Sequence, residues 1–300
     1  YVCETEAEME AAKGYVKDQT ADGYDMRMLD AQEIFDMEPY LARDLIGGFW
    51  SEPDCSMNPY KLCFAYVDAA VRMGMDILTH HEVKDILMED GKVAGVVTDQ
   101  GTYRTEKVVN CGGVWAPALG NMVGIDIPIK PRKGIVMISE RSFPICNQKI
   151  QEFGYMMSKF EDIEFTRNVS ERVERNNVAM VIEPTEADNF LLGGNREFRG
   201  YNIDSEIEVM QAVAERGIRF FPIMKEMNCI RTYSGLRPWV VDHLPIVSAI
   251  DTVPGYYIAA GHEGDGISMS AITGKLMSQL MTGEETDFNI DRLKFSRFQK

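Results

Sequence analysis

The chain has 300 residues, of which 45% are hydrophobic and 26% are charged, as in ordinary globular domains. Its 31 basic and 47 acidic residues give a formal net charge of −16, which argues against binding to duplex nucleic acid or anionic lipid. We therefore expect an acidic cytoplasmic protein with no nucleic-acid partner, membrane span or signal peptide.

The chain opens Tyr1-Val2-Cys3-Glu4 without an initiator Met, which favours a processed or truncated chain. Its cysteines form no CxxC pair, so we expect reduced thiols. The four histidines match no metal signature, and we predict no metal site. The cysteines are Cys3, Cys55, Cys63, Cys111, Cys146 and Cys229, and the histidines are His80, His81, His243 and His262.

The first third of the chain predicts helices and then strands. Residues 5–17 and 30–37 have the acidic starts of helices, and apolar residues recur at helical spacing from Asn58 to Met73. The period then changes to that of strands at 77–79, 83–88, 93–98 and 103–110. Asp90-Gly91 and Gln100-Gly101 predict the hairpin turns between them.

The rest of the chain predicts a short helix at 115–123, then a region of mainly β character at 128–240. That region contains strands at 134–139, 178–183 and 190–194 and one long helix at about 204–220. A strand at 256–260, a glycine loop at 261–266 and a helix at 267–281 follow, and Gly283 ends the helix. The pattern indicates a mixed α/β fold that is split by a β-rich insertion.

Three segments have the residue types of a binding site. Gly261-His262-Glu263-Gly264-Asp265-Gly266-Ile267 lies between a strand and a helix, where glycines let a ligand approach the N–H groups of the helix. The spacing alone leaves a ligand loop and a structural turn equally open. A reduced flavin is negative near its N1 and C2 carbonyl, and such a helix start would stabilise it.

The second segment, Val108 to Ala116, predicts a buried strand that ends in Gly112-Gly113, where ligands bind in open α/β sheets. The two glycines are equally consistent with a tight turn, and we expect Cys111 to be a small buried apolar residue.

The third segment is Gly235-Leu236-Arg237-Pro238, followed by Asp242-His243-Leu244-Pro245-Ile246. The planar fork of Arg237 suits bidentate capture of a carboxylate, whereas an isolated surface arginine would pair with an acid. Pro238 fixes the direction of the backbone at Arg237.

Together, the GGxWA, GLRP, DxxPI and GHxxxGI motifs, in this order and spacing, resemble the D-amino-acid oxidase superfamily. Within that superfamily, the chain is most similar to the glycine oxidase and sarcosine oxidase branch. The resemblance covers nearly the whole chain. It implies a discontinuous, incomplete Rossmann-like FAD-binding domain at 53–130 and 242–290. A substrate domain, mainly antiparallel β, would occupy 1–52 and 131–241.

The resemblance also implies roles for individual residues. Val83 corresponds to a backbone contact to the adenine, and Cys111, Gly112, Gly113 and Trp115 lie beside the dinucleotide. Arg237 corresponds to the arginine that binds the substrate carboxylate. The residues beside the isoalloxazine ring would be Gly261, His262, Gly264, Asp265, Gly266 and Ile267.

The chain departs from the family pattern at several positions. The family begins with a strand, GxGxxG and a helix, which this sequence lacks, so we expect about 80–90 residues of the family to be absent. We therefore expect this chain alone to bind FAD poorly, and its exposed sheet edge to self-associate or to pair with the missing segment.

Substrate contacts depart from the pattern too. A second basic residue of glycine oxidase corresponds to Gly264 or Asp265, and a substrate-binding Tyr corresponds to about Val181. Arg196 and Arg199 are candidates to compensate, or else are solvated. Sarcosine oxidases attach their flavin through a Cys near the GLRP motif; because none occurs here, we expect FAD to be non-covalent.

These observations favour an FAD-dependent oxidoreductase that oxidises the C–N bond of a small amino acid or N-methyl amino acid by hydride transfer to flavin. The alternatives are a flavin dehydrogenase of a hydroxy acid or glycerol 3-phosphate, and a non-catalytic fragment or subunit that does not hold FAD alone. Beyond the amino-acid substrate, the candidate partners are a redox partner subunit and a second copy of the chain in a homo-oligomer.

Overall fold

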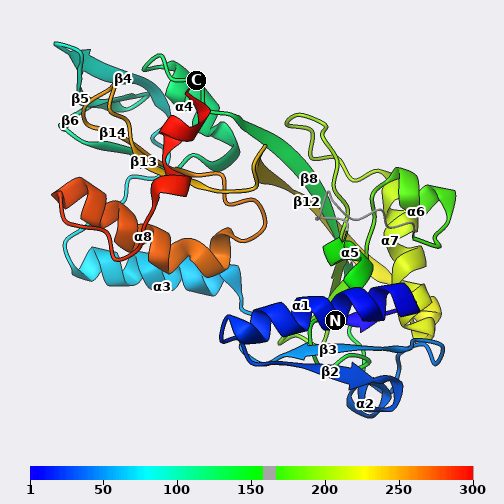
Figure 1. Ribbon diagram of the computed structural model, residues 1–300. Helices are drawn as coiled ribbons and strands as arrows, with labels where there is room; N and C mark the ends of the chain where they lie inside the picture. Colours follow the sequence, from blue (N-terminus) through cyan, green and yellow to red (C-terminus); the bar gives the residue numbers. More distant parts are fainter. Residues whose placement is uncertain (158–166, 300) are drawn as a thin grey trace. The chain divides into compact units, whose positions relative to one another are not determined.

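The structure is a computed structural model that describes residues 1–157 and 167–299 (Figure 1). The chain forms two compact units, each built from separate stretches of sequence. Unit 1 comprises 1–57, 133–197 and 202–235, and unit 2 comprises 58–132, 198–201 and 236–300. Part of the predicted substrate domain, residues 158–166, lies outside the described residues.

Unit 1 begins with a small antiparallel sheet in the order β1-β3-β2. Its first two helices start with capping boxes, in which Thr5 and Asp30 accept hydrogen bonds from the backbone N–H groups of Glu8 and Glu33. These elements are β1 (Val2–Cys3), α1 (Glu6–Ala21), β2 (Met26–Asp30), α2 (Ala31–Met37) and β3 (Gly47–Ser51).

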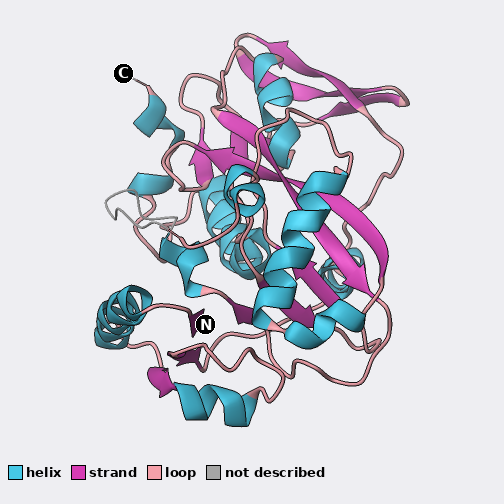
Figure 2. Cartoon of the chain, turned by 90° about the vertical axis from the view of Figure 1, so that its right-hand side faces the viewer, coloured by secondary structure: helices cyan, strands magenta, loops and turns pink. Residues whose placement is uncertain are grey.

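A second sheet, in the order β12-β8-β11-β10-β9, makes the larger part of unit 1. Its strands are β8 (Ile129–Ser139), β9 (Ile150–Gln151), β10 (Val181–Pro184), β11 (Phe190–Gly193) and β12 (Cys229–Val240) (Figure 2). The paired strands β8, β11, β10 and β9 are antiparallel to their neighbours. The helical segments are α5 (Phe153–Met157), α6 (Glu171–Arg175), α7 (Ile207–Phe220) and the 3₁₀ turn η2 (Pro222–Glu226).

The core of unit 1 lies between α7 and this sheet. One face of α7 buries Val209, Val213 and Phe220, at the spacing of an amphipathic helix, against sheet residues such as Ile182 and Leu192. Unit 1 is therefore an antiparallel sheet covered by a helix, as the β-rich pattern of the sequence predicts.

Unit 2 contains an antiparallel meander in the order β4-β5-β6 and a second sheet in the order β13-β14-β7. In the second sheet β14 runs parallel to β7 and antiparallel to β13. The strands are β4 (Val83–Glu89), β5 (Lys92–Thr98), β6 (Gly101–Arg104), β7 (Val108–Asn110), β13 (Ile246–Ala249) and β14 (Tyr256–Ala260). The helical segments are α3 (Pro59–Arg72), η1 (Gly113–Trp115), α4 (Ala116–Asn121), α8 (Gly266–Thr282), η3 (Asp291–Leu293) and η4 (Phe295–Phe298).

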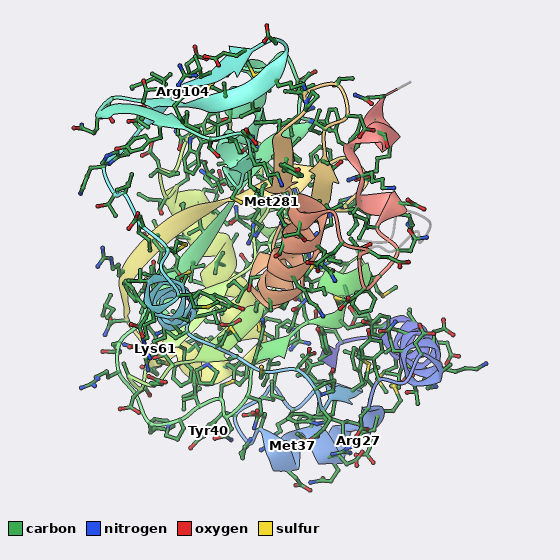
Figure 3. The ribbon with its side chains drawn as sticks, turned by 90° about the vertical axis from the view of Figure 1, so that its left-hand side faces the viewer. Arg27, Met37, Tyr40, Lys61, Arg104 and Met281 are labelled. Atoms are coloured by element: carbon green, nitrogen blue, oxygen red, sulfur yellow. The ribbon has the colours of Figure 1, made fainter. Side chains whose placement is uncertain are left out.

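Helix α3 is amphipathic, but it buries none of its side chains. Asn58 caps its first turn and Pro59 follows, as the sequence predicts. Tyr60 and Phe64 are 74% and 70% exposed, although their aromatic rings have the composition of a buried face. Figure 3 shows Lys61 on this helix. None of the helices in residues 1–157 and 167–299 has the length and hydropathy needed to cross a membrane.

The predicted mixed α/β fold class is confirmed, and most predicted elements are present within a few residues. Two strand predictions are wrong. Residues 77–79 form no strand, and 103–110 form two strands, because the chain turns between β6 and β7 to leave the meander and join β14. The sequence pattern also misses β12, whose exposed residues lack strict alternation.

Candidate functional site

The carboxyl end of β7 leads into a turn that is held by Asn110. This side chain is 2% exposed, and its Nδ2 donates to the carbonyl of Ala116 at 2.9 Å and to the Tyr256 hydroxyl at 2.8 Å. Its Oδ1 accepts from the N–H of Gly112 at 3.0 Å. A Cβ on Gly112 would lie 2.9 Å from Cδ1 of Leu119 and 3.1 Å from the backbone N of Ala116, so a side chain would crowd this point of the turn.

Tyr256 lies on the neighbouring strand β14 and is fully buried. Burial raises its pKa to about 12, against the opposing effect of the hydrogen bond from Asn110. The hydroxyl therefore stays protonated and joins β14 to the turn after β7. The predicted Gly112-Gly113 segment and the predicted strand before the glycine loop are thus fixed to each other.

The glycine loop follows β14 and ends at the first turn of α8. Gly261 has a φ of +87°, and a Cβ there would lie 2.6 Å from Cγ2 of Val240, so a side chain is excluded. The ring of His262 hydrogen-bonds through Nε2 to Oγ1 of Thr273 in α8 at 2.9 Å. Burial lowers the pKa of His262, against the opposing charge of Asp265, so its neutral form is favoured.

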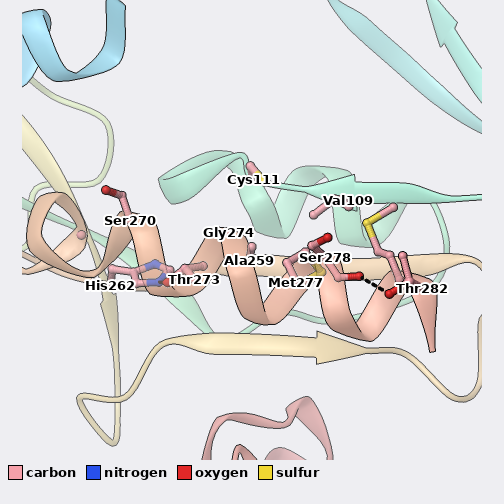
Figure 4. A pocket seen from close by; sticks show the side chains of 12 residues that line it. Val109, Cys111, Ala259, His262, Ser270, Thr273, Gly274, Met277, Ser278 and Thr282 are labelled. Carbon is pink, nitrogen blue, oxygen red and sulfur yellow. Dashed lines mark hydrogen bonds between the residues drawn. The ribbon is translucent and has the colours of Figure 1, made fainter. Parts of the chain in front are cut away.

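A groove with a volume of about 670 Å³ lies along α8 in unit 2 (Figure 4). Residues from both predicted glycine segments line it. They include Val109, Cys111, His262, Gly266, Thr273 and Met277. The structure therefore brings the turn after β7 and the start of α8 to one concave surface. Cys111 is exposed and lines this groove, so the prediction that it is buried is wrong.

Arg237 on β12 lies next to the glycine loop. A Cβ on Gly264 would lie 3.9 Å from Cδ of Arg237 and 4.0 Å from its Nε. The loop is also tied to this strand by its backbone, because the N–H of Glu263 donates to the carbonyl of Pro238 at 3.3 Å. The strand β12 and the loop before α8 thus place the guanidinium of Arg237 close to the N-terminus of α8.

Three residues that sequence reasoning missed form an ion network behind the loop. Oε2 of Glu263 accepts from Nη2 of Arg132 at 2.5 Å, and Oε1 lies 2.8 Å from Nδ1 of His243. The sequence offered one indication of this network, namely the acidic residue Glu263 between Gly261 and Gly264. Its partners come from β8 and from the turn before β13, which no local pattern relates to it.

Other predicted site residues lie elsewhere. Val83 pairs with Thr98 in the meander and does not line the groove. The half-exposed ring of Trp115 stacks on Tyr201 with centroids 6.3 Å apart. In unit 1, Arg196 lies over the ring of Tyr155 and donates to its hydroxyl at 3.2 Å.

Arg199 and Val181, two further positions where the chain departs from the family pattern, lie outside the lining of the groove. Arg199 is exposed, and its backbone bridges to Tyr201. Val181 lies on β10, opposite Gly193.

The surroundings of the groove fit FAD, whose dinucleotide needs close backbone approach and whose phosphates and ring need N–H donors. A Cβ on Gly112 or Gly261 would lie within 3 Å of a neighbouring side chain, so these glycines allow the tight turns that border the groove. The Asp265 side chain makes no capping hydrogen bond to the first turn of α8, which leaves N–H groups there for a ligand. Within residues 1–157 and 167–299, no cluster of His, Cys, Asp and Glu has the arrangement of a metal site.

Comparison with known proteins shows which proteins this chain is similar to. The chain is 28% identical over 275 residues to hydrogen cyanide synthase subunit HcnC of Pseudomonas protegens, covering 91% of this chain and 60% of that protein. It is 28% identical over 297 residues to D-amino acid dehydrogenase of Rhizobium rhizogenes, covering 98% and 66%. The chain therefore spans about two thirds or less of the length of these relatives.

A solved structure shows the same fold. Glycine oxidase from Geobacillus kaustophilus superposes with a TM-score of 0.85 at 24% identity, over 100% of this chain and 74% of that chain. The model of the family described as FAD dependent oxidoreductase matches residues 1–280. The chain belongs to this DAO family of FAD-dependent oxidoreductases.

Proposed function

We propose that the protein containing this chain is an FAD-dependent enzyme that oxidises the C–N bond of a small amino acid or N-methyl amino acid. The observation that carries the proposal is the position of Arg237 beside Gly264, at the loop that precedes α8. A cation next to a ligand-binding helix start suits a substrate whose carboxylate adjoins its reacting C–H bond. The names of D-amino acid dehydrogenase and glycine oxidase among the similar proteins support this substrate class.

Each part of the site has a separate task in this proposal. Arg237 binds the substrate carboxylate through two parallel hydrogen bonds and thereby orients the α-carbon. Gly112, Gly113 and the loop Gly261–Ile267 hold FAD non-covalently through close backbone contacts, and the N-terminus of α8 favours negative charge there. Bound FAD supplies the hydride acceptor. The neutral His262 fixes the loop to α8 through Thr273 and adds no positive charge.

The alternative substrate class is a hydroxy acid or glycerol 3-phosphate, which an arginine would also bind through its anionic group. The loss of oxidised-flavin absorbance separates the two classes when glycine, sarcosine, D-alanine, D-proline and glycerol 3-phosphate are added anaerobically to the FAD-loaded protein. We expect reduction by at least one of the amines. Reduction by glycerol 3-phosphate alone would replace the amino-acid proposal, and absence of FAD binding would favour a non-catalytic subunit.

A further inference from the structure

The carboxylate of Glu263 is held by two cationic or hydrogen-bonding side chains that are distant in the sequence. Glu263 and Arg132 are 12% and 11% exposed, and Nη2 of Arg132 lies 2.5 Å from Oε2 of Glu263. On the other side, Nδ1 of His243 lies 2.8 Å from Oε1. Exposed ion pairs contribute little because water screens them, but this carboxylate is largely withdrawn from water and depends on its partners.

The backbone of the same residues is strained. Glu263 has a φ of +50° and His243 a φ of +58°, in the left-handed region that glycine normally occupies. Such conformations persist only where surrounding contacts over-determine them, and they concentrate at functional sites. Here the two strained residues contact each other through their side chains, so the ion network opposes the relaxation of both turns.

The network also fixes the loop relative to the strands beneath it. Arg132 lies on β8, and His243 follows β12, whose residue Pro238 accepts a backbone hydrogen bond from Glu263. His243 is itself located by its N–H, which donates to Val240, and by its ring, which packs edge-on to Trp239 with centroids 6.0 Å apart. Glu263 is therefore the point at which β8, β12 and the loop before α8 are joined.

We propose that Glu263 is a positioning residue that holds the loop Gly261–Gly266 in the conformation that receives the flavin, through its ion pair with Arg132 and its contact with the His243 ring. The proposal rests on the proposed function for the identity of the ligand. Glu263 acts on the loop rather than on the substrate, because its carboxylate is directed to Arg132 and His243 and away from bulk solvent. A loop fixed before the ligand arrives loses less conformational freedom on binding, which raises affinity.

The first test measures hydrogen exchange of the loop amides in E263Q without added FAD. Glutamine keeps the shape of the side chain but removes the negative charge that pairs with Arg132 and contacts the His243 ring. We expect faster exchange at residues 261–266 and unchanged exchange in the meander β4–β6. E89Q is the matched control, because Glu89 forms an ion pair with Arg104 at 2.5 Å on that meander, where Figure 3 labels Arg104.

The second test titrates FAD into the intact protein and follows the quenching of flavin fluorescence. We expect E263Q to weaken FAD binding by about tenfold, equivalent to 1.4 kcal/mol, and E89Q to leave it unchanged. R132M should weaken binding to a similar extent, and the double variant E263Q/R132M should lose less than the product of the two single losses. This non-additivity would show that the residues act through their contact.

Two further outcomes decide between the proposals. Loop exchange and FAD affinity that remain at wild-type levels in a folded E263Q protein would overturn the positioning role. If E263Q does not fold, H243G provides the same test, because glycine relieves the strained φ and removes the imidazole; unchanged loop exchange in H243G would equally overturn the role. Absence of FAD binding by the full-length protein that contains this chain would contradict the proposed function, while the exchange test would still decide whether Glu263 fixes the loop.

Discussion

The side chain of Arg237 lies against Gly264, whose missing Cβ would be 3.9 Å from Cδ of the arginine. Gly264 does not have a positive φ, so its backbone would accept a side chain. A Cβ there would make an ordinary van der Waals contact with Arg237, so only a larger side chain would fill the space next to it. That space lies beside a guanidinium, where the proposed substrate carboxylate would bind.

Replacing Arg237 tests the proposed carboxylate clamp. We expect Arg237→Ala to lower kcat/KM by about 10²-fold or more, because a desolvated bidentate pair contributes roughly 2–5 kcal/mol. Arg237→Lys keeps the charge but loses the second parallel hydrogen bond, so it should recover only part of the loss. Steady-state kinetics at equal flavin content provide the measurement.

The control for Arg237 is Arg292→Ala, the same chemical change at an exposed arginine of unit 2, which should leave kcat/KM unchanged. Near-normal kcat/KM in flavin-loaded Arg237→Ala would make Arg237 a structural residue. Arg196 and Arg199 would then be the next candidates for the clamp.

Filling the space at Gly264 should affect substrate binding more than chemistry. We expect Gly264→Val to raise KM by about tenfold with little change in kcat, because the added methyl groups crowd the ground state and the transition state alike. Gly14→Val is the matched control, since nothing lies within 4 Å of a Cβ at Gly14 in α1. A KM for Gly264→Val equal to that of the control would show that the substrate lies elsewhere.

Asn110 should contribute to stability through three buried hydrogen bonds. Asn110→Leu removes partners from the N–H of Gly112, the carbonyl of Ala116 and the hydroxyl of Tyr256, and we expect a loss of about 3 kcal/mol in the free energy of unfolding. Tyr256→Phe removes one of these bonds and should cost about 1 kcal/mol. Urea denaturation gives both values, and equal losses in the two variants would contradict this assignment.

His262 should make stability depend on pH. Its folded-state pKa is lowered from 6.5 by burial, so the unfolded chain binds more protons in the window between the lowered pKa and 6.5. The contribution of His262 to the free energy of unfolding should therefore be complete above pH 6.5 and decrease as the pH falls through that window. Urea titrations from about pH 8 to about pH 5 provide the measurement.

His262→Gln isolates this contribution, because glutamine does not titrate and the remaining ionisable groups are common to both proteins. We expect the difference in free energy of unfolding between wild type and His262→Gln to shrink as the pH falls. Parallel stability curves for the two proteins would show that protonation of His262 is not coupled to folding.

Local sequence patterns identified the elements that carry the site. The strand at 256–260, the glycine loop and the helix closed by Gly283 are present as predicted, and Gly283 has the expected positive φ of +76°. The same holds for the hairpin at Asp90-Gly91 and for the helix after Pro59. These features depend on residues close together in the chain, such as caps, turns and apolar spacing, so their signals survive without knowledge of the fold.

The single strand predicted over 103–110 was wrong because both halves have strand character, and only pairing decides between them. β6 pairs with β5, whereas β7 pairs with β14 about 150 residues later, so a turn must separate them.

The amino-acid sequence by itself determined the mixed α/β class, the family resemblance and the identity of Arg237 and the glycine loop as candidate site residues. Only the tertiary structure placed Arg237 beside Gly264 and joined Glu263 to Arg132 and His243. A sequence motif reflects requirements of the local backbone, such as a turn that needs glycine. An ion network instead needs side chains from separate strands to lie close together. That convergence arises from strand pairing and core packing, which act between residues that the sequence separates by more than a hundred positions in the case of Glu263 and Arg132.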